Sequence, residues 1–543
     1  MKRFFSEINR RSFLRSSAAA GLAFGVPQEL FAQSFSAKAP DDLTWDGGGL
    51  RLLLPTVSDT RMLIKASFNA PLPEAPSLNI GNTAVRGVMS DTQGEHWQFY
   101  ADGLKPRQKY RLSLTGTKGR QLCEPWELST FPAPEDTPEK FRLLIFSCAG
   151  GHEVHQFLPT ATRNRLLRRG LSFKPDAMVA NGDHIYWDLL APVGKHLLGM
   201  SPEAVKLVGE FNRSDVVLGG SNETMLKRAA GPQIMPVYGT DFRSTPVFFL
   251  QDDHDNFDND EATDEVVTFP PSYFMIAMAR ATQGMYYPEF LPDNNRPLGL
   301  PWSSSSGRPK GVSESFGTLR YGKLAEILMY DCRRTMTLAG PSAVYIDPEV
   351  ENWLIHRTAS SDTEHLVHVP SLPPGWSAGK WGDWYPDVLG KDGKLTIAKP
   401  KPYWQAGWVK QHDRLMGAIA SQKNRIPLVI TGDLHAIAYG EMLRSGNLDF
   451  KDNPLNIVLA GPIGCRTNQY GWPSGRRGIG ATPSVHVDMK ETIPPLEKHG
   501  FSIVDFEPGK ITLRMFKWDW TSQDVEAIDA LQPMFTKEMT RPL

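Results

Sequence analysis

Residues 246–255 read PVFFLQDDHD, an apolar run that passes directly into aspartates and a histidine. The apolar half, residues 246–250, is typical of a strand that is covered on both faces. The acidic stretch continues to Asp260, and clustered carboxylates repel one another unless a cation lies among them. A solvated acidic turn is the simpler interpretation of this stretch taken alone. The rest of the chain decides between the two.

Other segments repeat this pattern of an apolar run that ends in polar or small residues. Near-continuous apolar runs predict strands buried on both faces, and residues 160–169 and 408–422, which lie between some of the runs, are helix-like. The sequence therefore predicts an α/β core, in which ligands gather beyond the carboxyl ends of the strands. The segments are FRLLIFSC (141–148), PDAMVANGD (175–183), LAEILMYDCRR (324–334), RIPLVITGDLH (425–435) and LNIVLAGPIG (455–464).

The part of the chain before this core has a different pattern. Residues 43–131 form short alternating segments separated by turn residues, which predicts a small β-sandwich. The stretch GLKPRQKYRLSL (103–114) resembles the late strands of a fibronectin-type-III-like module, and the proline-rich residues 131–138 suit a stiff linker. We therefore expect a β-sandwich domain over residues 38–135 and an α/β catalytic domain over residues 140–535.

Two long, turn-rich insertions interrupt the expected α/β domain, at about residues 188–245 and 335–403. Segments of this length without a clear strand or helix pattern are usually loops, so we expect loops or lids over the functional edge of the sheet. His365 and His368 fall in the second insertion and are expected to be solvated.

Composition and the N-terminus limit the possible classes of protein. The chain has 543 residues, more than one core usually fills, and its 59 Lys and Arg nearly balance 60 Asp and Glu, so charge does not favour a nucleic-acid partner. Paired arginines at Arg10-Arg11 precede an apolar run, Ala18 to Val26, that is too short to span a bilayer. Residues 1–33 resemble a twin-arginine signal peptide, which implies the twin-arginine export machinery as a partner and a periplasmic or secreted protein. We expect a monomer without stable membrane insertion.

Three short motifs at strand ends carry chemistry. They are GDHIY (182–186), DDHD (252–255) and GDLH (432–435). A strand followed by glycine and aspartate lets a carboxylate project freely from the edge of a sheet. Because three such motifs follow successive predicted strands, we expect them to form one site.

These motifs resemble those of the calcineurin-like metallophosphoesterases, and most closely those of the alkaline phosphatase D (PhoD-like) branch. The strand ending Phe146-Ser147-Cys148 and the sequence DCRR (331–334) add to this resemblance, which covers most of residues 43–535. It implies a four-layer α/β/β/α sandwich with a metal centre at the strand ends. It also implies metal-dependent hydrolysis of phosphomonoesters or phosphodiesters, which are small phosphate-ester substrates.

The resemblance further implies a role for each matched residue. Asp183 would bridge two metal ions, and His254 would lie beside the phosphate without binding metal and could protonate the leaving oxygen. Arg333 and Arg334 could grip a phosphate oxygen, although a structural ion pair is an equal alternative for them. The other implied ligands are Cys148, Tyr186 and His435 at one ion, and Asp253 and Asp433 at the other.

The kinds of ligand indicate which metals to expect. A thiolate, a phenolate and an imidazole suit a transition metal, and the phenolate favours Fe³⁺, with Zn²⁺ or Mn²⁺ as alternatives. The carboxylates of the second site are a hard oxygen set that suits Ca²⁺. Cys148 with His152 and His155 also fits a Cys/His zinc site. The remaining thiols, at Cys123, Cys332 and Cys465, are expected to be small buried hydrophobes.

Two further functions remain open from the sequence. The same metal pair could act on phospholipid-like diesters, in which case the two insertions would decide the substrate. A non-catalytic binding protein that keeps the fold is the other alternative. The combination of Asp183, Asp253, His254 and His435 argues against it, because a protein without activity has no need of a histidine that binds no metal.

Overall fold

The computed structural model describes residues 45–187, 202–256, 270–301, 309–377, 405–465 and 481–541, apart from residues 156, 294, 298, 310, 338–339 and 361. The expected signal peptide and the end of the acidic stretch, residues 257–260, lie outside the described residues. Residues Ser36–Leu543 form one compact unit. Within the described ranges, none of the helices is both long and apolar enough to cross a bilayer.

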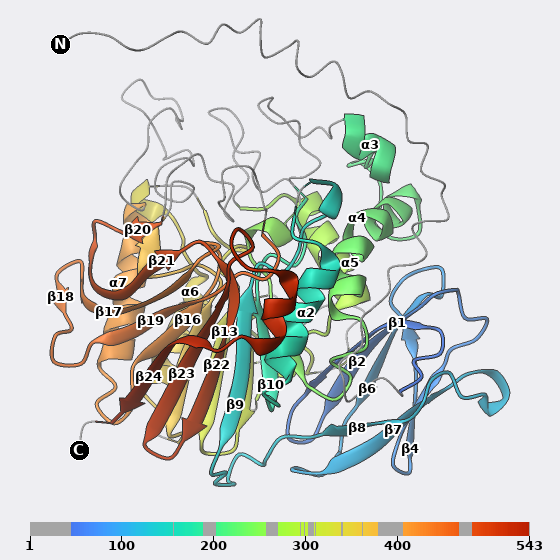
Figure 1. Cartoon of the computed structure of the whole chain (residues 1–543), viewed down its shortest axis with the longest axis horizontal. Coiled ribbons are helices and arrows are strands. Elements are labelled where there is room, and N and C mark those ends of the chain that lie inside the picture. Colours follow the sequence, from blue (N-terminus) through green and yellow to red (C-terminus); the bar gives the residue numbers. More distant parts are fainter. Residues whose placement is uncertain are drawn as a thin grey trace, which may run out of the picture. The chain divides into compact units, whose positions relative to one another are not determined.

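The first part of this unit consists of two antiparallel four-stranded sheets (Figure 1). Their inward-facing residues, among them Ile64 and Phe99 from one sheet and Leu112 and Leu128 from the other, belong to one apolar cluster. Two facing sheets with a shared core are the arrangement that the alternating pattern predicts. The sheets have the orders β1 (Leu50–Val57), β2 (Met62–Phe68), β6 (His96–Ala101), β5 (Val88–Met89), and β4 (Thr83–Arg86), β3 (Ser77–Ile80), β7 (Lys109–Thr115), β8 (Trp126–Ser129).

A six-stranded and an eight-stranded sheet form the centre of the α/β part. The first has the order β11 (Val247–Leu250), β10 (Ala177–Asn181), β9 (Phe141–Ser147), β22 (His499–Glu507), β23 (Lys510–Trp518), β24 (Pro533–Thr540). The second has the order β12 (Gly317–Tyr321), β13 (Ala325–Tyr330), β14 (His365–Pro370), β16 (Leu428–Thr431), β19 (Leu455–Ala460), β17 (Ile437–Ser445), β18 (Leu448–Asp449), and β21 (Val487–Leu496) also pairs with β17. A short pair, β15 (Trp376–Ser377) with β20 (Thr482–Pro483), lies apart.

The parallel strands of both sheets are those that the apolar runs predict. β9, β10 and β11 pair in parallel in the first sheet, and β13, β14, β16 and β19 do so in the second. The six apolar runs therefore become β9, β10, β11, β13, β16 and β19, and this prediction is confirmed. Parallel pairing places the carboxyl ends of these strands at one edge of each sheet.

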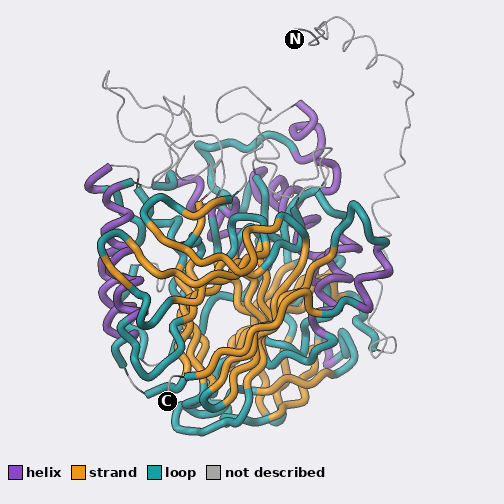
Figure 2. Tube along the Cα trace, turned by 60° about the vertical axis from the view of Figure 1, so that its left-hand side comes forward, coloured by secondary structure: helices purple, strands orange, loops and turns teal. Residues whose placement is uncertain are grey.

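Side-chain alternation along the strands produces four layers. Leu143 and Ile145 of β9 share an apolar cluster with Ile430 of the second sheet, whereas Leu144 and Phe146 point to the opposite face. Helices cover both outer faces, as Figures 1 and 2 show. This is the predicted α/β/β/α sandwich. The helices on the first sheet are α2 (Thr160–Leu171), α4 (Ser221–Tyr238) and α5 (Tyr273–Tyr286), and those on the second are α6 (Pro348–Thr358) and α7 (Ala406–Ala420).

The two insertions contain more regular structure than their sequences predict. The first includes α3 (Pro202–Val208) and α4, and the second includes α6 and the sheet strand β14. The expectation of solvated histidines is wrong, because His365 and His368 lie in β14 and are buried. His365 contacts the carbonyl oxygen of Glu507 at 2.8 Å, and both ring nitrogens of His368 have hydrogen-bond partners. Residues distant in sequence thus form hydrogen bonds with His365 and His368, the polar residues that suggested a loop in the sequence.

Candidate metal centre

The carboxyl ends of the two sheets meet at the carbonyl oxygen of Pro370, which ends β14. Asn181, the last residue of β10, donates its side-chain amide to this oxygen at 3.0 Å. Thr431, the last residue of β16, donates its hydroxyl to the same oxygen at 3.0 Å. The loops that follow β9, β10, β11 and β16 are therefore brought together across the two sheets.

Glycines allow these loops to approach one another closely. Gly182 has φ +75°, and a Cβ there would lie 2.4 Å from the Cβ of Asp252. A Cβ on Gly432 would lie 2.4 Å from the Cβ of Ser147. Both contacts are far below the van der Waals limit, so the glycine of each strand–glycine–aspartate motif is required by the packing of its loop.

The residues that follow these strands have unusual backbone conformations. Cys148, Asp183, Asp433 and His435 have φ of 50°, 55°, 61° and 50°, in the left-handed region that non-glycine residues rarely adopt. Backbone hydrogen bonds hold the first two: Cys148 N donates to Gly182 O at 3.1 Å, and Gly150 N donates to Asp183 O at 2.8 Å. Such strain persists only where the surroundings determine it, and it is concentrated at functional sites.

A first cluster of metal-ligating groups surrounds the carboxylate of Asp183. The hydroxyl of Tyr186 donates to Asp183 Oδ2 at 2.9 Å and lies 2.8 Å from His435 Nε2, which is itself 3.2 Å from Asp183 Oδ2. One ligand atom each of Asp183, His254 and His435 lie within 4.8 Å of one another. The same limit holds for ligand atoms of Cys148, His435 and a third residue, Cys465.

A second cluster consists of carboxylates. One oxygen each of Asp183, Asp252 and Asp253 lie within 4.8 Å of one another, and all three residues are buried. Asp183 thus belongs to both clusters, as a bridging carboxylate requires. Its Oδ1 atom and Oδ2 of Asp252 are buried and accept no hydrogen bond from the described residues. Buried carboxylate oxygens that accept no hydrogen bond fit a bound cation, since their desolvation is otherwise uncompensated.

The electrostatics of the two clusters favour a cation as well. Burial raises the pKa of Cys148, Tyr186 and Asp252 well above their ordinary values, and the negative charge of Asp183 raises all three further. Burial lowers the pKa of His435, but Cys148 and Asp183 outweigh it and raise this pKa to about 10. The site thus attracts positive charge strongly, and a bound cation would restore the anionic forms of its acidic ligands.

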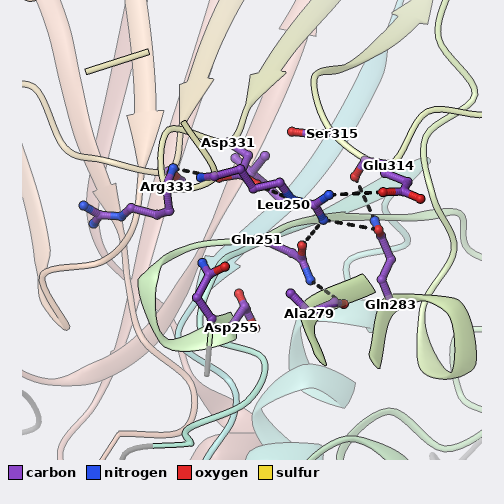
Figure 3. Close-up of polar contacts among 12 residues, drawn as sticks. Leu250, Gln251, Asp255, Ala279, Gln283, Glu314, Ser315, Asp331 and Arg333 are labelled. Carbon is purple, nitrogen blue, oxygen red and sulfur yellow. Dashed lines mark hydrogen bonds and ion pairs between the residues drawn. The ribbon is translucent and has the colours of Figure 1, made fainter. Parts of the chain in front are cut away.

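The two arginines of DCRR lie in ion pairs. The Arg333 side chain is fully buried; its Nε donates to Asp252 Oδ1, and its Nη2 lies 3.3 Å from Asp433 Oδ2. Arg334 is buried as well and pairs with Asp331 at 3.0 Å and Glu314 at 3.3 Å. In Figure 3, Arg333 points away from the cluster that Glu314 forms with its polar neighbours. This geometry is that of the structural ion pair, the alternative weighed for both arginines, and no phosphate contact is assigned to Arg334.

Asp255 supports the site without joining either cluster. Its carboxylate accepts hydrogen bonds from the backbone amides of Asp183, His184, Ile185 and Asp252, at 3.0, 2.8, 3.2 and 2.8 Å. These amides belong to the loops after β10 and β11. One carboxylate therefore ties together the two loops that carry Asp183, Asp252 and Asp253.

Most of the side chains that the sequence singles out lie together here. Cys148, Asp183, Tyr186, His254 and His435 gather in the first cluster and Asp253 in the second, whereas the carboxylate of Asp433 faces Arg333. His152, of the possible Cys/His zinc site, joins no cluster of ligand atoms among the described residues. The sequence analysis missed Cys465 and Asp252 as members. The position of Asp252 in DDHD could have revealed it, whereas nothing in the sequence near Cys465 resembles a ligand motif.

Comparison with known proteins bears on the fold. PhoD has a similar structure over 90% of this chain and 90% of its own, with 14% sequence identity and a TM-score of 0.55. The purple acid phosphatase PPD1 from yellow lupin (Lupinus luteus) seeds is similar over 90% of this chain and 74% of its own, with 12% identity and a TM-score of 0.52. Scans against protein-family models and against curated proteins found no match. The chain thus has the fold of the PhoD-like metallophosphoesterases and purple acid phosphatases.

Proposed function

We propose that the protein is a metal-dependent phosphoesterase that hydrolyses phosphomonoesters or phosphodiesters. The observation that carries this proposal is the convergence on Asp183 of two clusters of metal-ligating side chains, which come from the ends of β9, β10, β11 and β16. The fold that positions them is shared with PhoD and with a purple acid phosphatase. Proteins built on one fold can have different functions, so the donor groups, not the fold, support the chemistry.

The metal-ligating side chains of the two clusters would divide between two ions. Cys148, Tyr186 and His435 would hold one, Asp252 and Asp253 the other, and Asp183 both. Two cations bound there would polarise a phosphoryl oxygen and neutralise the charge that develops during displacement. Asp433 faces Arg333 and would reach an ion only if that contact changed.

Two other residues of the site, His254 and Arg333, have roles other than metal binding. In the proposed reaction a water oxygen attacks phosphorus and releases a proton to solvent, the ester P–O bond breaks, and the leaving oxygen takes a proton from His254. The His254 ring lies 4.3 Å from the Tyr186 ring, and one of its nitrogens is within 4.8 Å of Asp183. Arg333 holds Asp252 and Asp433 in place, so we assign it a positioning role.

Hydrolysis of p-nitrophenyl phosphate and of its bis-ester, with elemental analysis of the purified protein, tests this function. We expect metal and hydrolysis of at least one ester, and a loss of roughly 100-fold or more in kcat in Asp183→Asn. Asp449→Asn is the matched control, because Asp449 is exposed and its carboxylate contacts Lys451, through the backbone amide at 3.0 Å and Nζ at 3.6 Å. Full turnover by Asp183→Asn would refute the assignment of Asp183 as the shared ligand.

The identity of the metals has its own test. We propose Fe³⁺ beside Tyr186 and Ca²⁺ beside the carboxylates, because phenolate favours ferric iron and hard oxygens favour calcium. A ferric–phenolate pair absorbs visible light, so Tyr186→Phe should keep the fold and lose this absorption band. A colourless, fully active wild-type enzyme would point instead to Zn²⁺ or Mn²⁺.

We further propose that the protein is exported after folding, by the twin-arginine route. The support is the sequence Arg10-Arg11-Ser12-Phe13-Leu14, followed by a short apolar run. Export only after folding would let the chain acquire its metals in the cytoplasm. Replacing Arg10 and Arg11 by lysine should retain the protein in the cytoplasm, as fractionation would show. Unchanged export of this variant would exclude the route.

A further inference from the structure

The segment after β19 lies against the segment after β9. Ser147 N donates to Gly461 O at 2.9 Å, Ile463 N donates to Ser147 O at 3.0 Å, and Gly464 N donates to Cys148 O at 2.8 Å. These bonds join the ends of two strands from different sheets, and an isolated parallel bridge between Ser147 and Pro462 sets their register. Cys465, the next residue, is therefore held beside Cys148 by the backbone.

Close packing fixes this segment further. A Cβ on Gly464 would lie 2.5 Å from the carbonyl oxygens of both Ala149 and Gly150, so the chain can pass here only as glycine. A ring nitrogen of His499, at the start of β22, lies 3.2 Å from the carbonyl oxygen of Cys465. The segment that ends at Cys465 thus has defined partners at the end of β9 and on β22.

The cysteine side chain faces the first cluster. Sγ of Cys465, Sγ of Cys148 and a ring nitrogen of His435 lie within 4.8 Å of one another, and all three residues are buried. Two thiolates on one ion lie no more than about 4.6 Å apart, because a metal–sulfur bond is about 2.3 Å long. Only a small adjustment is needed for both sulfur atoms to bind one ion.

A buried positive charge lies near the same cysteine. Arg163 is fully buried and donates Nη1 to the carbonyl oxygen of Ala149 at 2.9 Å, while Nε and Nη2 reach no hydrogen-bond acceptor in the described part of the chain. Its charge interacts with Glu153 first, and then with Tyr238, Cys465 and Tyr186. A buried guanidinium favours anionic groups around it, as a site with two thiolates and a phenolate would supply.

We propose that Cys465 is a second sulfur ligand of the ion that Cys148 and His435 bind. This inference rests on the proposed function, because it requires a metal at the first cluster. When the ion binds, each thiol loses its proton to solvent and a metal–sulfur bond forms. Two thiolates and an imidazole make this a softer site than one thiolate would, and they select a transition metal more strongly.

Cobalt loading measures the number of sulfur ligands directly. Metal-stripped full-length protein is titrated with Co²⁺, and the sulfur-to-cobalt charge-transfer band in the near ultraviolet is recorded. Cys465→Ser should lose about half of the band at saturation, and Cys148→Ser a similar share, because each thiolate contributes its own transition. Cys123→Ser is the control: this buried cysteine lies between β7 and β8 of the N-terminal part and should leave the band unchanged.

The outcomes separate this inference from the proposed function. If Cys465→Ser saturates with Co²⁺ at the full wild-type band, Cys465 is not a ligand, although the phosphoesterase proposal stands. If wild-type protein binds no Co²⁺ and carries no metal when purified, both proposals fail. A disulfide between Cys148 and Cys465 in the purified protein would also overturn the inference. Thermal unfolding shows whether each variant folds, and Cys465→Ala replaces the serine variant if it does not.

Discussion

At the scale of single residues, strain and chemistry coincide at the strand ends. Of the eight described non-glycine residues with positive φ, four are Cys148, Asp183, Asp433 and His435. A side chain in this conformation costs about 1 kcal/mol, which glycine would not. A chain optimised only for stability would place glycine at these positions. The side chains present there are therefore explained by what they bind.

Asp433 allows this strain to be measured. Asp433→Gly and Asp433→Ala both remove the carboxylate that faces Arg333, but only alanine keeps the strain at φ 61°. We expect the glycine variant to be more stable than the alanine variant by about 1 kcal/mol in urea unfolding. An alanine variant of equal or greater stability would show that the left-handed backbone at this position is not strained.

The residues of the site could be predicted from the sequence only where a short motif marks them. Asp183, Tyr186, His254 and His435 belong to short motifs that end apolar runs, and these residues lie together in the structure. Cys465 has no such mark, because backbone hydrogen bonds between segments far apart in the chain place it beside Cys148. The sequence allows a structural ion pair for Arg333, but its partner could not be predicted, since Asp252 lies 81 residues away in sequence.

At the scale of elements, loops tied to strand ends position the site. Asp255 stands in the short 3₁₀ turn Asp253–Asp255 and accepts four backbone amides from the loops after β10 and β11. From the sequence, Asp253 is the only residue of DDHD expected to bind metal, and the structure gives the last aspartate, Asp255, to backbone amides. One acidic motif therefore contains both ligand candidates and the group that orients them.

Removing the Asp255 carboxylate should affect both stability and metal binding. Asp255→Ala leaves four amides without their acceptor, and we expect a loss of about 3 kcal/mol in the free energy of unfolding. We also expect weaker metal retention by elemental analysis, because Asp183 and Asp252 lose the group that fixes their loops. Asp215→Ala, in an exposed loop, is the control. An Asp255→Ala protein with wild-type stability and metal content would contradict this role.

A second carboxylate joins three strands of the first sheet. Asp505 of β22 accepts hydrogen bonds from Arg142 of β9, at 2.6 and 2.9 Å, and from Arg514 of β23, at 2.6 Å. Lys140 lies 3.7 Å away. Burial alone would raise the pKa of Asp505, but the two arginines outweigh it and hold this pKa below its usual value.

This lowered pKa predicts how stability depends on pH. The unfolded chain binds the proton more readily, so the contribution of Asp505 is fully present above a pH of about 4 and is lost as the pH falls through the folded pKa. Asp505→Asn should lower the Tm at neutral pH and flatten its decline in acid. Thermal unfolding across this pH range measures both effects. A variant whose Tm falls in acid as steeply as that of the wild type would contradict the assignment.

At the scale of the whole molecule, buried polar contacts join the N-terminal sheets to the α/β part. Lys65 of β2 is fully buried, lies 3.0 Å from Glu289 and donates to the carbonyl oxygen of Gly284 at 2.7 Å. Thr92 donates to Glu223 of α4 at 2.5 Å. A buried ion pair is stable only when both partners are held in place, so the N-terminal sheets and the α/β part should unfold together.

Lys65 tests this coupling. Lys65→Met leaves the Glu289 carboxylate buried without its ammonium, and we expect a loss of about 3–5 kcal/mol. The double variant Lys65→Met/Glu289→Gln should recover part of that loss, because neither position then carries a buried charge. Both are measured by urea unfolding followed at two wavelengths. A loss below about 1 kcal/mol would mean that the pair behaves like an exposed one.

The α/β core could be predicted because its signal is repeated. Six apolar runs with polar ends specify its parallel strands, whereas the four layers are implied only by the family resemblance. β14, α4 and α6 could not be predicted, since their polar residues are satisfied by distant partners such as Glu507. An identity of 14% with PhoD over the shared fold shows how little of the sequence the architecture constrains.

The central claim is that side chains from four strand ends share a pair of cations. Diffraction data collected at metal absorption edges, from crystals of the purified protein, test it most directly. We predict two anomalous peaks beside Asp183, one within bonding distance of Cys148 and His435 and the other of Asp253. An active protein whose anomalous map shows no peak among these residues would contradict the account.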